Sequence, residues 1–351
     1  MTSHRRRPRS FLPPHMLRSI AENGTPEQRS RALRTLSVDS TLRFTRAAPQ
    51  RPGVGLPTPE GQKRRSIYTA HGTEALPGTL ARSEGQAAAG DDAVDEAYDG
   101  LGATYDFYWE VFTRHSIDDE GLPLRGTVHF GQAYDNAFWN GEQMVFADGD
   151  GELFRRFTVC LDVIGHELTH GVTADETRLQ YWMQAGALDE SISDVFGSLI
   201  KQWGLRQTAA QADWLIGAGL FTNRVKGRAV RSMQAPGTAY DDPVLGKDPQ
   251  PGNFSHYVHT MEDNGGVHVN SGIPNRAFYL AACALGGCAW ERAGRIWYET
   301  LRDSHLRAST GFRSFARLTT ANASRLYGPN SDEERIVRDA WQQVGVLGAR
   351  G

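Results

Sequence analysis

Two histidines four residues apart form the first pattern with clear chemical meaning in this sequence. They belong to the segment His166-Glu167-Leu168-Thr169-His170, which lies in an apolar frame with helical spacing. Residues i and i+4 leave the same face of a helix about 6 Å apart, so both imidazoles can reach one metal ion. Glu167 would face the same ion. The pattern indicates a candidate metal site, although two histidines alone do not make one.

A third ligand is expected because a catalytic zinc ion takes three protein ligands and keeps a fourth position for water. One zinc subclass uses a histidine ten residues after the first, but Glu176 stands there, which excludes that subclass. The helix predicted next offers carboxylates instead. Glu190 and Asp194 are four residues apart, so one can bind the metal while the other holds a ligand imidazole. Asp189 could hold the other imidazole.

With these motifs, residues 67–345 resemble the thermolysin family of zinc endopeptidases. Three further segments carry the resemblance: Asn-Ala-Phe-Trp-Asn at 136–140, Arg-Ser-Met at 231–233 and Asp-Asn-Gly-Gly-Val-His-Val-Asn-Ser-Gly at 263–272. The leader, with Pro-Pro-His-Met-Leu at 13–17, is similar to the short propeptide of the protealysin-like subgroup. The resemblance implies an α+β fold with a strand-rich N-terminal lobe, a mainly helical C-terminal lobe, the zinc cleft between them and a short helical propeptide in front.

The resemblance also implies a role for each residue of the site. It makes His166, His170 and Glu190 the ligands of one zinc ion and Glu167 the general base. The former carbonyl oxygen of the substrate would be stabilised by His268 and Tyr181, with Asp263 orienting the histidine. Tyr181 taken alone could equally be a core tyrosine.

Substrate binding is implied in the same way. The family positions that hold the peptide in an extended pose along an edge strand are Asn136, Ala137 and Arg231. The pocket for the residue after the cut is lined by Phe154, Phe157, Val163 and Val230. These apolar residues imply cleavage on the amino side of bulky hydrophobic residues, although core and pocket residues look alike in sequence. Arg231 could instead be one partner of a surface ion pair.

Calcium binding departs from the family pattern. Thermolysin-like enzymes bind two calcium ions beside the zinc, and at the matching positions Asp162 and Asp213 remain acidic. Lys201, Leu215 and Ala218 stand where acids are expected. Because an ammonium group repels Ca²⁺, we predict that the double site is lost and that Lys201 supplies positive charge to the two carboxylates. Calcium elsewhere stays open.

Charge divides the chain into a leader and a body. Residues 1–66 carry 14 Lys and Arg against 4 Asp and Glu, whereas the remainder carries 24 against 37. A basic leader can be a solvated tail or a nucleic-acid arm, but opposite charge favours docking on its own body. We therefore expect a cationic propeptide and linker at 1–66, an N-terminal peptidase lobe at 67–172 and a helical C-terminal lobe at 173–351. The propeptide would inhibit the enzyme within the molecule, and autocleavage would fall between Ala47 and Ile67.

Local signals place the elements. Thr25, Pro26 and Gln28 form a capping box that opens a second leader helix after a short one at 16–22. Alternation predicts a strand at 127–130, and Asn140-Gly141 predicts a hairpin between 137–139 and 144–146. Helical periodicity predicts helices near 93–115, 158–176, 188–203, 271–286, 290–303, 311–326 and 332–344.

Composition narrows the remaining choices. No apolar run of about 18 residues appears, which argues against a membrane partner, and a net charge of -3 gives no sign of nucleic acid. The family resemblance implies secretion, but no signal peptide is recognisable, so the cytoplasm is the alternative. Cys283 and Cys288 could form a disulfide or stay free. The expected partners are protein or peptide substrates.

Two alternative functions remain. A zinc aminopeptidase shares both metal motifs, but the acidic anchor for a free amine, usually within Gly-x-Met-Glu-Asn, does not occur in the sequence. A non-catalytic, zinc-stabilised binding module would leave Glu167 and His268 without a role.

Overall fold

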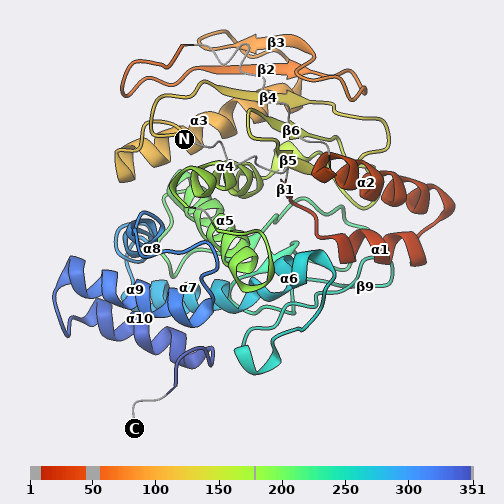
Figure 1. The fold of residues 1–351 in the computed structure, drawn as a ribbon. Coiled ribbons are helices and arrows are strands. Elements are labelled where there is room, and N and C mark those ends of the chain that lie inside the picture. The colour runs from red at the N-terminus through yellow and green to blue at the C-terminus, as the bar shows by residue number, and fades with distance from the viewer. Residues whose placement is uncertain (1–8, 45–55, 178, 349–351) are drawn as a thin grey trace. The chain divides into compact units, whose positions relative to one another are not determined.

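The computed structural model describes residues 9–44, 56–177 and 179–348 (Figure 1). The predicted linker lies partly outside these residues. The chain forms two compact units. The N-terminal unit comprises Met1–Val172 with Gly217–Gly227 and Asp242–Gly246, and the C-terminal unit comprises Thr173–Ile216, Arg228–Asp241 and Lys247–Gly351. Each unit is described by itself.

A six-stranded mixed sheet organises the N-terminal unit, with strand order β1-β5-β6-β4-β2-β3 (Figure 1). The strands are β1 (Arg9–Ser10), β2 (Arg65–Thr69), β3 (Thr79–Ser83), β4 (Leu124–Val128), β5 (Ala137–Trp139) and β6 (Met144–Phe146). β4 runs parallel to β2 and to β6, and the other neighbours are antiparallel. Helix α3 (Asp92–Phe112) packs against β2 and β4. The strand-rich expectation for this part of the chain is confirmed.

The hairpin predicted at Asn140-Gly141 is present. β5 and β6 pair in antiparallel register, with Ala137 opposite Phe146 and Trp139 opposite Met144. Gly141 has φ +99°, a value that favours glycine at this turn. The predicted strand at 127–130 is shorter in the structure, because β4 ends at Val128 and the next residue, His129, has φ +56° and leaves the extended conformation.

Two helices of the leader lie side by side in the N-terminal unit, α1 (Pro14–Asn23) and α2 (Pro26–Phe44) (Figure 1). The capping box is formed as predicted, since Thr25 N–H donates to Gln28 Oε1 at 3.0 Å and Gln28 N–H to Thr25 Oγ1 at 3.3 Å. Met16, Leu17 and Ile20 of α1 are buried. The leader is therefore a folded part of the unit.

Helix α4 (Leu161–Glu176) follows a short 3₁₀ turn at Phe157–Val159 and carries both motif histidines. It lies close to α3, because a Cβ atom added to Gly100 would come within 2.3 Å of Ile164 Cδ1. Glycine at this position permits the close approach of the two helices. The histidine-bearing turn is thus fixed against the body of the N-terminal unit.

Helices dominate the C-terminal unit: α5 (Met183–Gly204), α6 (Asp263–Asn270), α7 (Gly272–Leu285), α8 (Ala293–Leu301), α9 (Phe312–Tyr327) and α10 (Asp332–Gln343). α10 packs against α7 and α9, and the indole rings of Trp297 and Trp341 stack at 6.2 Å. The short strands β7 (Leu215–Ile216) and β8 (Arg231–Ser232) form a ribbon in this unit. Two further short strands, β9 (Asp241–Asp242) and β10 (Gly246–Lys247), pair with each other at the points where the chain passes from one unit to the other.

The helices predicted for this part of the chain are confirmed to within a few residues, with two differences. α5 begins at Met183, five residues before the predicted start. The prediction missed these first turns because they contain Gly186, which disfavours a helix, and lack apolar periodicity. No helix is predicted at α6, where Asn264, Gly265 and Gly266 have positive φ values. The two glycines disfavour a regular helix, and the structure kinks there.

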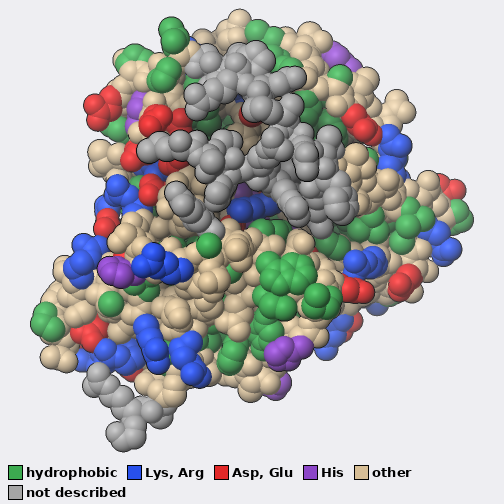
Figure 2. All heavy atoms as spheres, in the orientation of Figure 1, with side chains coloured by type: hydrophobic (Ala, Val, Ile, Leu, Met, Phe, Trp, Pro, Cys, Tyr) green, Lys and Arg blue, Asp and Glu red, His purple; other side chains and the backbone are tan. Residues whose placement is uncertain are grey.

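The structure also bears on membrane crossing, surface charge and cysteine pairing. No helix within the described ranges is long and apolar enough to cross a membrane. On the face shown in Figure 2, basic and acidic side chains are interspersed. Cys283 and Cys288 are not joined in a disulfide, which settles the choice left open by the sequence.

Candidate metal centre

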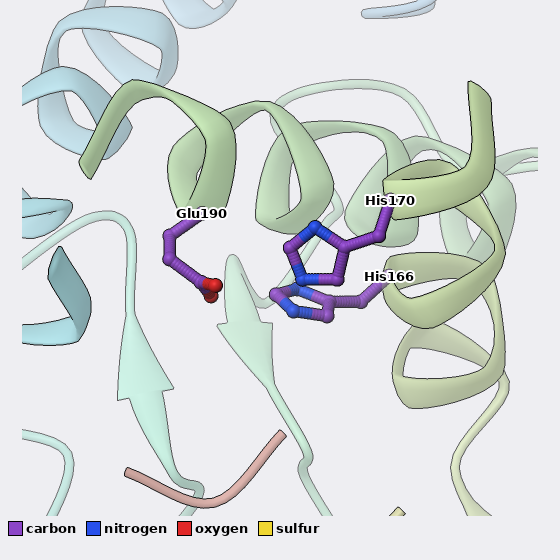
Figure 3. A group of neighbouring side chains, drawn as sticks. All are labelled: His166, His170 and Glu190. Atoms are coloured by element: carbon purple, nitrogen blue, oxygen red, sulfur yellow. The ribbon is translucent and has the colours of Figure 1, made fainter. Parts of the chain in front are cut away.

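Three buried side chains meet as the sequence predicts. The ligand atoms of His166, His170 and Glu190 all lie within 4.8 Å of one another, and each side chain is at most 1% exposed. Figure 3 shows the two imidazoles leaving the same side of α4, with the Glu190 carboxylate from α5 facing them. The imidazole centroids are 4.7 Å apart. Among the described residues, this is the only such group of three or more metal-ligating side chains.

The donor set fits zinc. Two neutral imidazoles and one carboxylate form the ligand combination of a catalytic zinc site, and they leave a fourth position for water. Burying three polar side chains together without an ion would carry a desolvation cost, which metal coordination offsets. The residues present therefore suit a divalent zinc ion.

Within the C-terminal unit, a chain of polar contacts leads away from Glu190. The Tyr181 hydroxyl donates to Glu190 Oε1 and lies 3.4 Å from His268 Nε2. His268 Nδ1 lies 2.7 Å from Asp263 Oδ1, and Asp263 Oδ2 also accepts the His268 backbone N–H at 2.9 Å. Asp263 therefore holds both the backbone of His268 and the Nδ1 side of its ring, and Nε2 is directed towards Tyr181 and Glu190.

The charge environment of His268 favours its protonated form. Burial alone lowers the pKa of this histidine, but the Asp263 and Glu190 carboxylates outweigh burial and raise the pKa above its ordinary value. His268 can then act as a hydrogen-bond donor through Nε2.

Glu167 is fully buried on α4, and its carboxylate contacts the edge of the sheet. The Trp139 backbone N–H of β5 donates to Glu167 Oε2 at 3.0 Å. This contact ties the predicted general base to the strand on which the sequence analysis placed the substrate.

In the structure, a segment of the leader pairs with β5. β1 pairs antiparallel with β5, with Arg9 opposite Trp139 and Ser10 opposite Phe138. The pairing continues through the Phe11 backbone N–H, which donates to the Ala137 carbonyl at 3.0 Å. The next residue, Leu12, donates its N–H to Asn136 Oδ1 at 2.8 Å.

Leader side chains also contact the histidine motif. The Phe11 ring meets the His166 imidazole edge to face at 5.4 Å, and Arg9 Nη1 lies 3.1 Å from His170 Nδ1. Phe11 and Leu12 are fully buried. The described part of the leader therefore covers both the sheet edge and the two predicted imidazole ligands.

Asn136 contacts two parts of the leader, helix α2 and the residues just after β1. Its amide nitrogen donates to Asp39 Oδ2 of α2 at 3.0 Å, while its amide oxygen accepts from Leu12 N–H. Tyr134 donates its hydroxyl to the other oxygen of Asp39 at 2.7 Å. All of these side chains are buried.

Arg231 and Asp194 form a buried ion pair in the C-terminal unit. Arg231 Nε and Nη2 each donate to Asp194 at 2.8 Å, and Asn275 donates to Asp194 Oδ2 at 2.8 Å. Arg231 is therefore part of an ion pair, as the alternative interpretation held. Because Arg231 is only 2% exposed, this pair is buried and does not lie at the surface. Asp189, which was expected to hold an imidazole, is 1% exposed.

The apolar residues assigned to the specificity pocket are all buried. Phe154 and Phe157 have ring centroids 6.1 Å apart, and Phe154 also lies 5.9 Å from Phe221. Val163 lies on α4 in the same unit, and Val230 lies in the C-terminal unit next to β8.

Lys201 contacts one of the two carboxylates that the sequence assigned to it. Its Nζ lies 3.0 Å from Asp213 Oδ1 and donates to the Leu215 carbonyl at 2.7 Å. Asp162, in the N-terminal unit, accepts the Gly217 backbone N–H at 3.2 Å. In the C-terminal unit an ammonium group thus lies beside Asp213, one of the two remaining acids.

Sequence analysis missed two functional features of the leader. The two-residue strand β1 is too short for an alternation signal, and Asp39 has no motif around it. The pairing of β1 with β5 and the contact of Asp39 with Asn136 both depend on the tertiary structure. Only the prediction that the leader docks on the body pointed towards them.

Comparison with known proteins adds an independent view of the whole chain. Residues 52–174 match the family described as thermolysin metallopeptidase, catalytic domain, and residues 177–346 match its alpha-helical domain. Residues 9–37 match the protealysin propeptide.

Individual relatives agree with these matches. An extracellular metalloprotease of Pectobacterium carotovorum subsp. carotovorum is 56% identical over 96% of both chains, and Protease PrtS of Photorhabdus sp. (strain Az29) is 48% identical over 96% of this chain and 92% of that protein. The solved precursor of protealysin, a metalloproteinase from Serratia proteamaculans, superposes with a TM-score of 0.89. It is 56% identical and covers 97% of this chain and 100% of that one.

Proposed function

Because this chain belongs to the thermolysin metallopeptidase family and is a metalloendopeptidase, we propose that it is a neutral protease made as a self-processing zymogen, which cleaves peptide bonds on the amino side of bulky hydrophobic residues. The observation that carries this proposal is the convergence of His166, His170 and Glu190, three buried ligand atoms within 4.8 Å. A zinc ion held there supplies Lewis acidity that activates water and polarises the scissile carbonyl.

Glu167 takes the role of general base. It is buried beside the ligand histidines, and its carboxylate is positioned by the Trp139 backbone N–H at 3.0 Å. A carboxylate in this position accepts the proton of the attacking water and then passes it to the departing amine. The water oxygen forms a new bond to the carbonyl carbon, the peptide C–N bond breaks, and the proton taken from the water ends on the nitrogen of the departing amine.

His268 and Tyr181 stabilise the negative charge that develops on the carbonyl oxygen. Asp263 fixes the His268 ring at 2.7 Å, and the Tyr181 hydroxyl lies 3.4 Å from His268 Nε2. Donors that are held in place before the reaction need no reorganisation when the charge appears. Asp263 acts through His268 and is a positioning residue.

The substrate lies along β5 in an extended conformation. The support for this proposal is β1, a segment of the chain's own leader that pairs antiparallel with β5 and reaches Ala137 and Asn136 through its backbone. Main-chain pairing at an edge strand binds peptides without regard to sequence, so side-chain pockets must provide selectivity. Phe154, Phe157, Val163 and Val230 would form the pocket that accepts a bulky apolar residue. Arg231 would contribute to binding from its place beside Asp194.

Residues 1–66 act as propeptide and linker, followed by catalytic lobes at 67–172 and 173–351. The leader competes with substrate for β5 and covers both histidines, which supports intramolecular inhibition. Relatives named as extracellular metalloproteases support a site of action outside the cell.

Calcium is replaced by a lysine at the position of the double site. The Lys201 ammonium lies 3.0 Å from Asp213, which gives that acid a fixed positive partner. A cation of the chain itself thus takes over the charge balance that Ca²⁺ provides in relatives.

Peptide cleavage mapping tests the proposal. The processed enzyme should cut internally quenched peptides before Leu, Phe or Ile, and a zinc chelator should abolish the cuts. Zinc binding without any cleavage would favour the binding-module alternative. Removal of single N-terminal residues would favour the aminopeptidase.

A further inference from the structure

A buried acidic side chain lies where a bound peptide would continue along β5. Ser10 is opposite Phe138, Phe11 N–H reaches the Ala137 carbonyl, and Leu12 N–H reaches Asn136 Oδ1. The leader then turns away, because α1 begins at Pro14. Without that turn, the next residue of an extended peptide would arrive at Asp135, the residue before Asn136 in the sequence.

In the structure, helix α2 covers Asp135. Arg31, Thr35 and Asp39 recur at four-residue spacing and therefore share one face of the helix. Arg31 forms a two-pronged contact with the Asp135 carboxylate, with Nε 2.9 Å from Oδ2 and Nη2 bonded to Oδ1. Thr35 Oγ1 accepts the Asp135 backbone N–H at 3.0 Å. Asp39 holds Asn136.

The body provides more than one acceptor for the guanidinium group. Arg31 Nη2 also donates to the Gly149 carbonyl at 3.1 Å. Burial alone lowers the pKa of Arg31, but Asp135, Asp150 and Asp148 together raise it above its ordinary value. Nearby, Gln28 of the same helix donates to Glu152 Oε2 at 3.0 Å. A planar fork of donors matches a carboxylate plus a carbonyl better than a lysine ammonium does.

We propose that Asp135 and the Gly149 carbonyl form a guanidinium-binding subsite of the mature enzyme, which binds an arginine side chain of a peptide substrate on the C-terminal side of its β5-paired segment. Arg31 fills this subsite in the zymogen. Removal of α2 uncovers it, and the continuing substrate strand brings its own side chains there. The inference rests on the proposed endopeptidase function and adds a selectivity that main-chain pairing and an apolar pocket do not provide.

Matched quenched peptides test this subsite on the processed enzyme. Each peptide carries Arg, Lys or citrulline at one of the second to fourth positions after the cut, where citrulline keeps the shape of Arg without its charge. We expect the Arg peptide to have a kcat/KM about threefold to tenfold above the citrulline peptide at one position, with Lys between them. Asp135→Asn should bring the Arg and citrulline peptides to the same rate.

The control is Asp99→Asn, which removes an exposed acid of α3 and should retain the full preference for Arg. Equal rates for Arg and citrulline at all three positions would overturn the subsite, as would an Arg preference that survives in Asp135→Asn. If Asp135→Asn fails to mature, the kcat/KM values of the wild type still test the subsite, which requires the Arg peptide to be cut fastest, the Lys peptide next and the citrulline peptide slowest. Failure of the wild type to cut any of these peptides would instead contradict the endopeptidase proposal itself.

Discussion

Glu167 has two separable properties at the residue scale: it lies on α4 beside the ligand histidines, and it does not belong to the group of three ligands. Replacing it with Ala removes the general base and leaves His166, His170 and Glu190 in place. We expect Glu167→Ala to lose about 10²-fold to 10⁴-fold in kcat and to keep the zinc content of the wild type. Peptide hydrolysis and elemental analysis on the same sample measure both quantities. Loss of zinc together with activity would mean that Glu167 is a structural support of the site.

Several residues of the site could be predicted from the sequence, and others could not. The ligand trio follows from helical spacing and from a carboxylate on the next helix, because both are local patterns. Asp39 was not accessible, since its contact with Asn136 joins segments 97 residues apart. For Asp194, the sequence offered a role beside an imidazole, which stays a prediction; its bonds to Arg231 and Asn275 were not predicted, because they join segments far apart in the chain.

At the scale of elements, His129 links the start of α3 to the segment after β6. Its Nε2 lies 3.0 Å from Asp91, the N-cap of α3, and its Nδ1 lies 2.8 Å from Asp148. Burial alone lowers the pKa of His129, but Asp148 and Asp91 raise it above its ordinary value. A raised pKa stabilises the folded state below the ordinary histidine pKa, and this stabilisation is lost as pH rises through the folded-state pKa.

A pH series of thermal unfolding tests this link. His129→Gln should lower Tm most near pH 6, and the effect should become smaller as the pH rises through the folded-state pKa of the wild-type imidazole. The difference should stay below about 1 kcal/mol, because both carboxylates are solvent-exposed. A Tm difference that is constant from pH 6 to pH 9 would rule out the charge contribution and leave only packing.

Lys201 belongs to the same scale, because it connects α5 to the segment before β7. Lys201→Met would leave Asp213 without its ammonium partner at 3.0 Å. We expect the variant to lose up to about 1 kcal/mol of stability, because Asp213 is partly exposed. The wild-type Tm should not change between a calcium-selective chelator and millimolar Ca²⁺. A Tm increase of several degrees with Ca²⁺ in the wild type would contradict the replacement.

The fold was predictable to different degrees along the chain. Helices α7 to α10 have strong apolar periodicity, and the Asn140-Gly141 turn is a local signal, so their positions follow from sequence. β1 and α6 do not follow. β1 is a strand only because β5 offers a free edge to it, and α6 contains two glycines that a sequence pattern assigns to a loop.

For the whole molecule, the leader is a substrate-like strand carried by the enzyme itself. If the site cuts its own linker, removing the general base should stop maturation. Purified Glu167→Ala should therefore remain at full length, 38.7 kDa, under conditions in which the wild type is shortened. Intact-mass spectrometry reports both species. A small amount of mature wild type added to the variant shows whether the linker can be cut in trans, and normal shortening of the pure variant would refute self-processing.

The proposed chemistry requires one ion held jointly by two imidazoles of α4 and the Glu190 carboxylate of α5. The most direct test is the zinc content of the wild type and of Glu190→Gln, measured by elemental analysis after dialysis against a weak chelator. We expect about one zinc ion per chain in the wild type and a strong loss in the variant, since three protein ligands are needed to retain the ion. Equal zinc in both proteins would contradict the assignment of Glu190 as a ligand.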